Sequence, residues 1–303
     1  MKLKTRRFIA VDILLIIMMV LPLVCAITLK VLTTPLSEGI TITGAQIYFT
    51  IPMPIQDLPI TTAQINSWLV LISVFALCLY LTHGLSVKGN SKRQMVVEWI
   101  VEQTEGMVKT SMGDFFSGYA PFIAAIIGLS AFSSLLSLFG LYPPTSDINV
   151  VAGWSILVFI LITYYKLKGG VGNYLKGFTE PIFIMTPLNV LGEVATPISM
   201  AFRHYGNVLS GSVIAVLVAA GLQAASSMIF GWLPGILGEF PFLQVGIPAV
   251  LSVYFDIFSG CMQAYIFAML TMLNISGGFP AELYQKRMQK KLEKKNKKEK
   301  INN

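Results

Sequence analysis

The fold is decided by the stretch TPISMAFRHYGNVLSGS at residues 196–212, in which Arg203 is the only Asp, Glu, Lys or Arg. The nearest charged residues on either side are Glu193 and Glu239, so Arg203 lies within a long uncharged run. A guanidinium does not lose its proton in proteins, and exposing it to lipid is strongly unfavourable. We therefore expect Arg203 to face a wet cavity or a partner protein at mid-membrane depth.

The composition indicates a polytopic membrane protein, because 54% of the 303 residues are hydrophobic and only 12% are charged. Apolar stretches long enough to cross a bilayer occur near residues 8–29, 66–85, 119–142, 149–165, 187–222 and 243–275. The last two exceed the roughly 20 residues that a perpendicular crossing needs, so they are expected to be tilted or kinked. The sequence therefore predicts an all-α fold with about six spanning helices.

The net charge of +7 is local. Nine of the 22 basic residues and two of the 15 acidic residues lie in residues 286–303, so this tail alone carries +7. The rest of the chain is balanced, which gives no indication of nucleic-acid binding. The tail is interpreted as a disordered cytoplasmic end, with attraction to anionic lipids as the alternative.

The orientation follows from where the basic residues fall between spans. They precede the first span and follow the second, fourth and sixth, so both chain termini are expected in the cytoplasm.

The first span has the basic start of a signal peptide but no clear cleavage site, and an uncleaved helix is expected. Residues 33–65 are predicted to be extended on the outer side. Residues 88–118 are predicted to form an amphipathic helix at the cytoplasmic interface or against partner helices.

Three Asp, Glu, Lys or Arg residues fall in the last two predicted spans: Glu193, Arg203 and Asp256. Asn207 lies four residues beyond Arg203, and Gln263 lies seven beyond Asp256, so each helix has a polar face. These residues indicate a polar path through the membrane. The alternative is a buried ion pair between Arg203 and Asp256, with the other polar residues joining helices.

Other chemistry has little support in the sequence. The cysteines and histidines lack the spacing of metal ligands, and they are Cys25, Cys78, Cys261, His83 and His204. There is no phosphate-binding glycine loop and no nucleophile motif, so we expect no catalytic centre, no metal and no cofactor.

Several motifs carry a resemblance to a known family. They are PLNVLGE at 187–193, PISMAFRHYGNVLSG at 197–211, PTSDINV at 144–150 and QAYIFAMLT at 263–271, with the amphipathic stretch 98–113 in support. This pattern resembles subunit a of the F-type ATP synthase, the membrane stator that conducts ions to a rotating ring of c subunits. The resemblance extends over residues 66–278. Residues 1–65 would add an N-terminal helix and an outer segment, and 279–303 a basic cytoplasmic tail.

The resemblance implies a role for each polar residue. Arg203 would be the stator arginine that faces the c-ring carboxylates and separates two half-channels. The residues of the outer half-channel would be Asn207, Ser212, Asp256 and Gln263, and those of the cytoplasmic half-channel Glu193 and Asn189. The two long last helices would wrap the c-ring. ATP chemistry would belong to other subunits.

The sequence departs from the family pattern at a few positions. Ser212 stands where many members have an acidic residue, and Asp256 where many have histidine, so the acidic function is expected to have moved to Asp256. Ser137 stands where asparagine is usual. The route of the outer half-channel therefore follows less directly from the resemblance than the role of Arg203.

The resemblance implies partners and a location. The partners would be the c-ring, subunit b and the other ATP synthase subunits, in a bacterial plasma membrane. Protons are the expected ion, with Na⁺ as the alternative. Two other functions have less support in the sequence. An ion-coupled secondary transporter usually carries a repeated half, and no internal repeat is found. An intramembrane enzyme requires a nucleophile with a base, or a metal pair.

Overall fold

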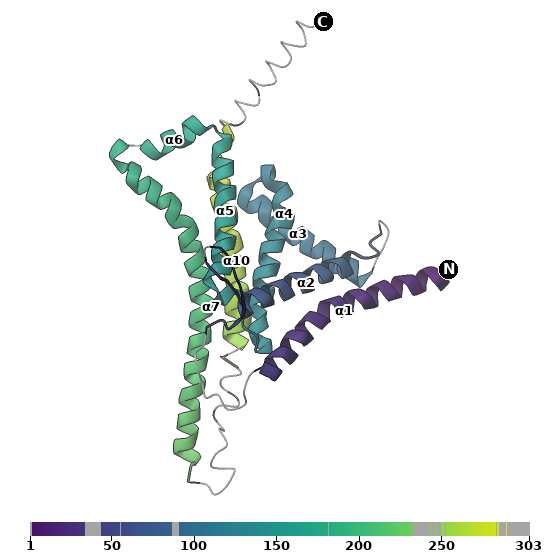
Figure 1. Cartoon of the computed structure of the whole chain (residues 1–303). Helices are drawn as coiled ribbons and strands as arrows, with labels where there is room; N and C mark the ends of the chain where they lie inside the picture. Colours follow the sequence, from purple (N-terminus) through teal and green to yellow (C-terminus); the bar gives the residue numbers. More distant parts are fainter. Residues whose placement is uncertain are drawn as a thin grey trace.

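The computed structural model describes residues 2–33, 44–54, 56–86, 91–180, 182–232 and 253–282, together with residues 243, 246, 250, 251, 284 and 289 (Figure 1). Six helices among these residues are long and apolar enough to cross a membrane. They cover Ile9–Leu32, Thr62–Thr82, Asp114–Phe139, Ile148–Lys168, Phe183–Phe230 and Val253–Gly277. The prediction of an all-α polytopic membrane protein with six spans is confirmed.

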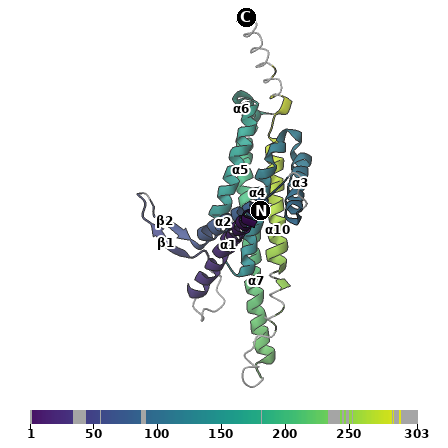
Figure 2. The same ribbon diagram turned by 90° about the vertical axis from the view of Figure 1, so that its right-hand side faces the viewer.

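The N-terminal part consists of two neighbouring helices and a hairpin. Helix α1 (Lys2–Thr33) lies beside α2 (Thr62–Thr82), and both are inclined to the long central helices (Figure 1). Between them, β1 (Ile47–Ile51) and β2 (Leu58–Thr61) pair as antiparallel strands and project from the helices (Figure 2). Thr61 ends β2 and caps α2, because its side chain accepts a hydrogen bond from the backbone N–H of Gln64. The hairpin falls within the stretch predicted to be extended.

The middle of the chain contains α3 (Lys92–Met112), η1 (Asp114–Tyr119), α4 (Ala120–Leu135), η2 (Leu136–Phe139), η3 (Pro144–Ser146) and α5 (Ile148–Lys168). Ser91 caps α3 and Asp147 caps α5, each through its side-chain oxygen. Helix α3 buries Thr104, Val108 and Met112, which recur every four residues along one face. The predicted amphipathic helix is therefore present, and its location at the cytoplasmic interface stays a prediction.

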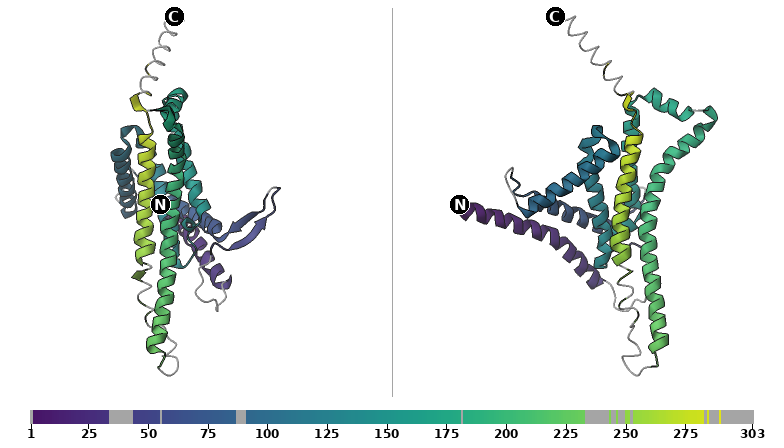
Figure 3. Two further views of the ribbon diagram at one scale, coloured as in Figure 1. Left: turned by 90° about the vertical axis from the view of Figure 1, so that its left-hand side faces the viewer. Right: turned by 180° about the vertical axis from the view of Figure 1, so that it is seen from behind.

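The last part of the chain contains α6 (Val171–Thr179), η4 (Phe183–Met185), α7 (Thr186–Phe230), the π-helical η5 (Val253–Ser259) and α10 (Gly260–Gly277). Helix α7 has 45 residues, which at about 1.5 Å per residue makes it roughly twice as long as a bilayer core is thick. Its first part is inclined to the remainder (Figure 3), and Pro197 removes a backbone donor in that first part. The predicted long fifth span is confirmed. Most of residues 243–252, which belong to the predicted sixth span, lie outside the described residues.

The core forms around α10, which contacts α3, α4, α5 and α7. Its fully buried side chains Phe267, Met272 and Ile275 pack with Val108 of α3, and the same cluster includes Ile123, Val158, Ile162 and Met200. Few residues of α7 are buried in this core. One side of the longest helix is therefore left uncovered by the described chain.

Candidate functional site

Arg203 lies on the uncovered side of α7. Its side chain is exposed, and it forms no ion pair or hydrogen bond with any residue that the structure describes. Ser199 and Ser210 are exposed at positions −4 and +7 from it, on the same helical face. The alternative of a buried Arg203–Asp256 pair is wrong. Because an unpaired cation is strongly unfavourable against lipid, this face requires a partner of opposite charge or water.

The opposite side of α7 is fixed by His204. Its side chain is fully buried, and its Nε2 lies 3.2 Å from Oγ of Ser130 on α4. The rings of Phe267 and Trp154 lie edge-on to it, with centroids 5.3 and 6.0 Å away. Adjacent residues of a helix point about 100° apart, so anchoring His204 inward holds Arg203 at the uncovered face.

One turn beyond Arg203, Asn207 joins α7 to the last helix. Its Nδ2 donates to Oγ of Ser259 at 3.0 Å and to Oε1 of Gln263 at 3.4 Å. Gln263 is only 3% exposed, whereas Asn207 is exposed. Two of the predicted site residues are therefore in direct contact, one turn from the arginine.

A small cavity of about 50 Å³ follows these residues. Its polar lining consists of Ser134, Ser137, Asn207, Ser212, Asp256 and Ser259. Asp256 is half-buried and lies in the π-helical η5. Such segments are frequent at functional sites, because the wider turn redirects side chains. Three predicted residues, Asn207, Ser212 and Asp256, thus line one cavity.

Glycines allow the close packing around this cavity. A Cβ added at Gly260 would lie 2.8 Å from Cβ of Ser134, so α4 and α10 approach too closely there for a larger residue. A Cβ at Gly211 would lie 3.4 Å from the ring of Phe255. The approach of α4, α7 and the last helix therefore depends on a missing side chain at Gly260.

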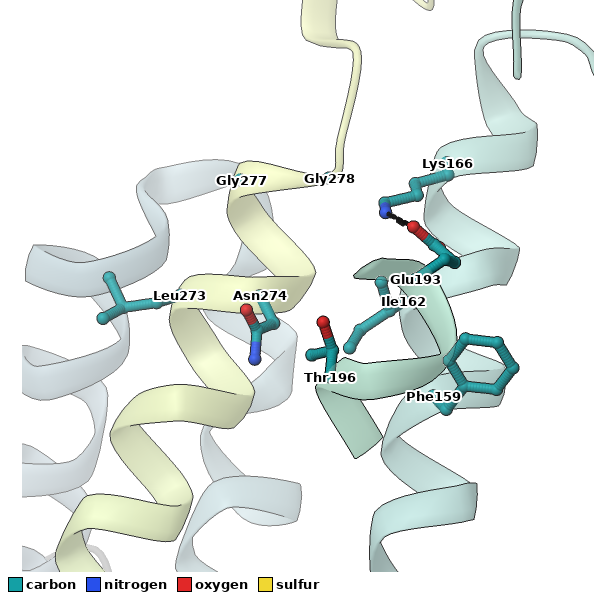
Figure 4. A pocket seen from close by; sticks show the side chains of 9 residues that line it. All are labelled: Phe159, Ile162, Lys166, Glu193, Thr196, Leu273, Asn274, Gly277 and Gly278. Carbon is teal, nitrogen blue, oxygen red and sulfur yellow. Dashed lines mark hydrogen bonds and ion pairs between the residues drawn. The ribbon is translucent and has the colours of Figure 1, made fainter. Parts of the chain in front are cut away.

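The opposite end of the site is formed by Glu193 near the beginning of α7. Both oxygens of its carboxylate accept hydrogen bonds from Nζ of Lys166 on α5, at 2.8 and 2.6 Å (Figure 4). Asn189 lies one turn earlier and donates to the backbone oxygens of Phe178 and Glu180, at 2.8 and 3.1 Å. Glu193 and Asn189 are thus close together, and Asn189 also holds the loop that leads into α7.

Two cavities meet at the Lys166–Glu193 pair. One of about 210 Å³ is lined by Thr196 and by Asn274 of α10, among others (Figure 4). The other, of about 520 Å³, extends past Asn189 and Tyr174. Burial, and then the neighbouring Glu193 carboxylate, raise the pKa of Tyr174, so its hydroxyl stays protonated at neutral pH.

The polar features lie on both sides of Arg203 along one helix. At about 1.5 Å per residue, Glu193 lies roughly 15 Å along α7 in one direction and Ser212 roughly 14 Å in the other. In the described part of the chain, no three His, Cys, Asp or Glu side chains gather in a way that could hold a metal. The polar cavities on both sides of Arg203 suit the passage of a small ion.

Sequence reasoning missed some residues at both ends. It did not single out Lys166, Thr196 or Asn274 at one cavity, or Ser134 and Ser259 at the other. A signal for Lys166 was available. Lys166 lies near the end of one span, and Glu193 lies near the beginning of the next. Two consecutive spans that are connected on one side of a membrane bring these two residues close together.

Comparison with known proteins gives a consistent match. Residues 64–276 match the family described as ATP synthase A chain. A protein of Macrococcus caseolyticus named ATP synthase subunit a is 32% identical over 215 residues, which cover 67% of this chain and 83% of that protein.

Two further relatives cover more of the chain. One, from Legionella pneumophila (strain Paris), is also named ATP synthase subunit a and is 28% identical over 229 residues, which cover 75% of this chain and 90% of that protein. The other, from Propionigenium modestum, is named ATP synthase subunit a, sodium ion specific. It is 26% identical over 277 residues, which cover 81% of this chain and 86% of that protein.

Proposed function

The chain belongs to the ATP synthase subunit a family, and on that premise we propose that it provides two offset half-channels separated by Arg203. The observation that carries this proposal is the position of polar cavities on both sides of Arg203 along α7, with the exposed arginine between them and unpaired among the described residues. Each cavity would connect one side of the membrane to the uncovered face of α7. A partner that moves along this face would then receive ions from one route and release them into the other.

Arg203 acts on the partner through its permanent charge. A guanidinium beside a carboxylate favours the ionised form, so each c-ring carboxylate that arrives at Arg203 releases its ion. The same charge repels a cation that would otherwise pass straight between the half-channels. The absence of an acidic partner for Arg203 among the described residues supports this role, because the complementary charge is then left to another subunit.

The outer half-channel is formed by Asn207, Ser212, Asp256 and Gln263. Asp256 is the ionisable group of this route, and the serine and amide side chains around it would hold ordered water. The half-buried position of Asp256 in a polar cavity supports the assignment. The hydrogen bond from Asn207 to Gln263 connects this route to the helical turn that follows Arg203.

The cytoplasmic half-channel is formed by Glu193 and Asn189. Both line the larger cavity at the beginning of α7, and the basic residues nearby in the sequence assign this end to the cytoplasm. Both chain termini then lie in the cytoplasm. The protein is a multi-pass membrane protein with bacterial relatives, and a bacterial plasma membrane is the proposed location.

The proposed partners are the c-ring, subunit b and the remaining ATP synthase subunits, which carry out the ATP chemistry. This chain itself is proposed to be non-catalytic. Protons are the proposed ion, and Na⁺ is the alternative because one relative is named as sodium ion specific. The basic tail after residue 285 is proposed to contact anionic lipids at the cytoplasmic surface.

The proposal is tested by Arg203→Ala in the assembled complex, with ATP-driven ion uptake measured in inverted membrane vesicles. Loss of uptake with normal amounts of assembled complex is expected, because the c-ring carboxylates would no longer release their ions beside Arg203. Normal coupled uptake by this variant would refute the role of Arg203.

A further inference from the structure

Lys166 and Glu193 form the boundary between two cavities. Both residues, with Gly277 and Gly278, line the 210 Å³ cavity that extends along α5 toward Phe159. The same residues line the 520 Å³ cavity that extends along α6. The ion pair therefore lies between the two cavities, on the direct path from one to the other.

The Lys166 side chain is held in this position by packing as well as by charge. A Cβ added at Gly278 would lie 3.0 Å from Cε and 3.1 Å from Cγ of Lys166, so the lysine stem passes directly over the end of α10. The side chains of Lys166 and Glu193 are 28% and 15% exposed, which leaves the pair only partly accessible to water. The close contact at Gly278 indicates that the Lys166 stem packs against the end of α10, between the two cavities.

We propose that Lys166 is a tethered counter-ion that competes with the translocated cation for the Glu193 carboxylate. The inference rests on the proposed function, since it concerns the cytoplasmic route to the stator arginine. With the ammonium on Glu193, the passage is closed by the pair. When a cation reaches the carboxylate, the ammonium moves into the larger cavity, and the net charge at Glu193 is unchanged.

The chemistry of lysine suits such an exchange. Its ammonium is a strongly hydrated point charge on a flexible four-carbon stem, so it can leave the carboxylate for water without moving the backbone. A proton and Na⁺ carry the same charge as the ammonium. Among the described residues, the titratable groups that face Glu193 are Lys166 from α5 and Tyr174 from α6, while α10 contributes Asn274, which does not titrate. Lys166 is therefore the cation in competition.

The test is Lys166→Gln in the whole ATP synthase in inverted vesicles, where the medium is the cytoplasmic side. Initial rates of ATP-driven uptake are measured across medium pH at fixed Na⁺, and across Na⁺ at fixed pH. Without the competing ammonium, Glu193 binds the translocated ion more tightly. The ion concentration for half-maximal uptake is expected to fall about tenfold, which for protons is a shift of about one pH unit upward. If uptake depends on pH the translocated ion is the proton, and if it depends on the Na⁺ concentration the ion is Na⁺.

Three variants separate this role from a structural one. Lys166→Arg keeps the charge and is expected to stay close to the wild type. Lys168→Gln changes a neighbouring lysine, whose Nζ lies 4.4 Å from the centre of the Tyr165 ring. No shift in the ion concentration for half-maximal uptake is expected for this variant. In a Glu193→Gln background, Lys166→Gln is expected to cause no further shift, because the carboxylate is already absent.

Several outcomes overturn the proposal. They are an unchanged ion dependence in Lys166→Gln, an equal shift in Lys168→Gln, or a shift that persists in the Glu193→Gln background. If Lys166→Gln does not assemble, Lys166→Met is measured in its place. Failure of both to assemble, while Lys166→Arg assembles, makes the pair structural and also overturns the proposal. Arg203→Ala tests the proposed function separately, so loss of pumping there with no shift here contradicts this inference alone.

Discussion

Asn207 on α7 donates a 3.0 Å hydrogen bond to Oγ of Ser259, the last residue of the π-helical η5. The bond joins the helix that carries Arg203 to the segment that carries Asp256. Asn207 also contacts Gln263 one turn further along the last helix. This amide side chain therefore helps to fix the position of Arg203 relative to the cavity that Asp256 lines.

Replacing that amide is expected to weaken ion translocation. Asn207→Leu keeps a similar volume and removes both hydrogen bonds, which are worth about 1 kcal/mol each. ATP-driven uptake is expected to fall about five- to thirtyfold, with assembly retained. Ser210→Ala is the matched control, because the Ser210 hydroxyl bonds only to the backbone oxygen of Asn207 in the described structure. Equal rates in the two variants would argue against a positioning role for Asn207.

Asp256 is the acidic residue that lines the cavity proposed as the outer half-channel. Asp256→Asn keeps the shape of the side chain but cannot exchange a proton, so conduction is expected to slow by about tenfold or more. Uptake should be measured across a pH series, with Asp57→Asn on the exposed β1–β2 hairpin as the control. Uptake like that of the control at every pH would show that Asp256 has no part in the outer route.

The approach of α4 to α10 gives a prediction about stability. Gly260→Ala places a methyl group 2.8 Å from Cβ of Ser134, and neither atom is at the end of a flexible chain. Overpacking of this kind costs about 1–3 kcal/mol, so a lower yield and a lower midpoint of thermal unfolding of the solubilised complex are expected. Gly128→Ala on α4 meets nothing within 4 Å and serves as the control. Similar midpoints would contradict the packing argument.

Asp12 joins helix α1 to the end of α2 and to α3, in addition to the apolar contacts of α1. Its carboxylate accepts two hydrogen bonds from Arg93 of α3, at 2.9 and 3.1 Å, and lies 3.0 Å from Nδ1 of His83. Both carboxylate and guanidinium are partly buried, so removal of one partner leaves the other charge poorly solvated.

Asp12→Asn is therefore expected to loosen the docking of α1. Disulfide cross-linking between cysteines introduced on α1 and α2 measures this docking, and a several-fold fall in its yield is expected. Lys109→Gln breaks an exposed pair with Asp114 and is expected to have no effect. Unchanged cross-linking in Asp12→Asn would show that apolar contacts alone hold α1.

The sequence was sufficient for the number and approximate position of the spans, because runs of apolar residues report directly on burial in lipid. It was less informative about how helices end. The fifth span was predicted to end near residue 222, yet α7 continues to Phe230, since nothing in that stretch breaks a helix. The π-helical turn around Asp256 has no sequence signature and depends on packing.

Pairings between distant residues were also beyond the sequence. Lys166 and Glu193 are separated by 27 positions, and Asp12 and Arg93 by 81, so neither pair follows from helical periodicity. Both result from which helices become neighbours. The polar faces that contain Arg203, Asn207 and Gln263 were predictable, because a helix places residues three, four and seven apart on one side.

The central claim is that the charge of Arg203 bars direct passage between the half-channels, and passive ion flux tests it most directly. Sealed vesicles with the assembled complex are given an ion gradient without ATP, and the decay of the gradient is followed for wild type, Arg203→Lys and Arg203→Ala. We predict a faster decay only in Arg203→Ala, because Arg203→Lys retains the positive charge that repels cations. Decay in Arg203→Ala as slow as in the wild type, at equal amounts of complex, would contradict the claim.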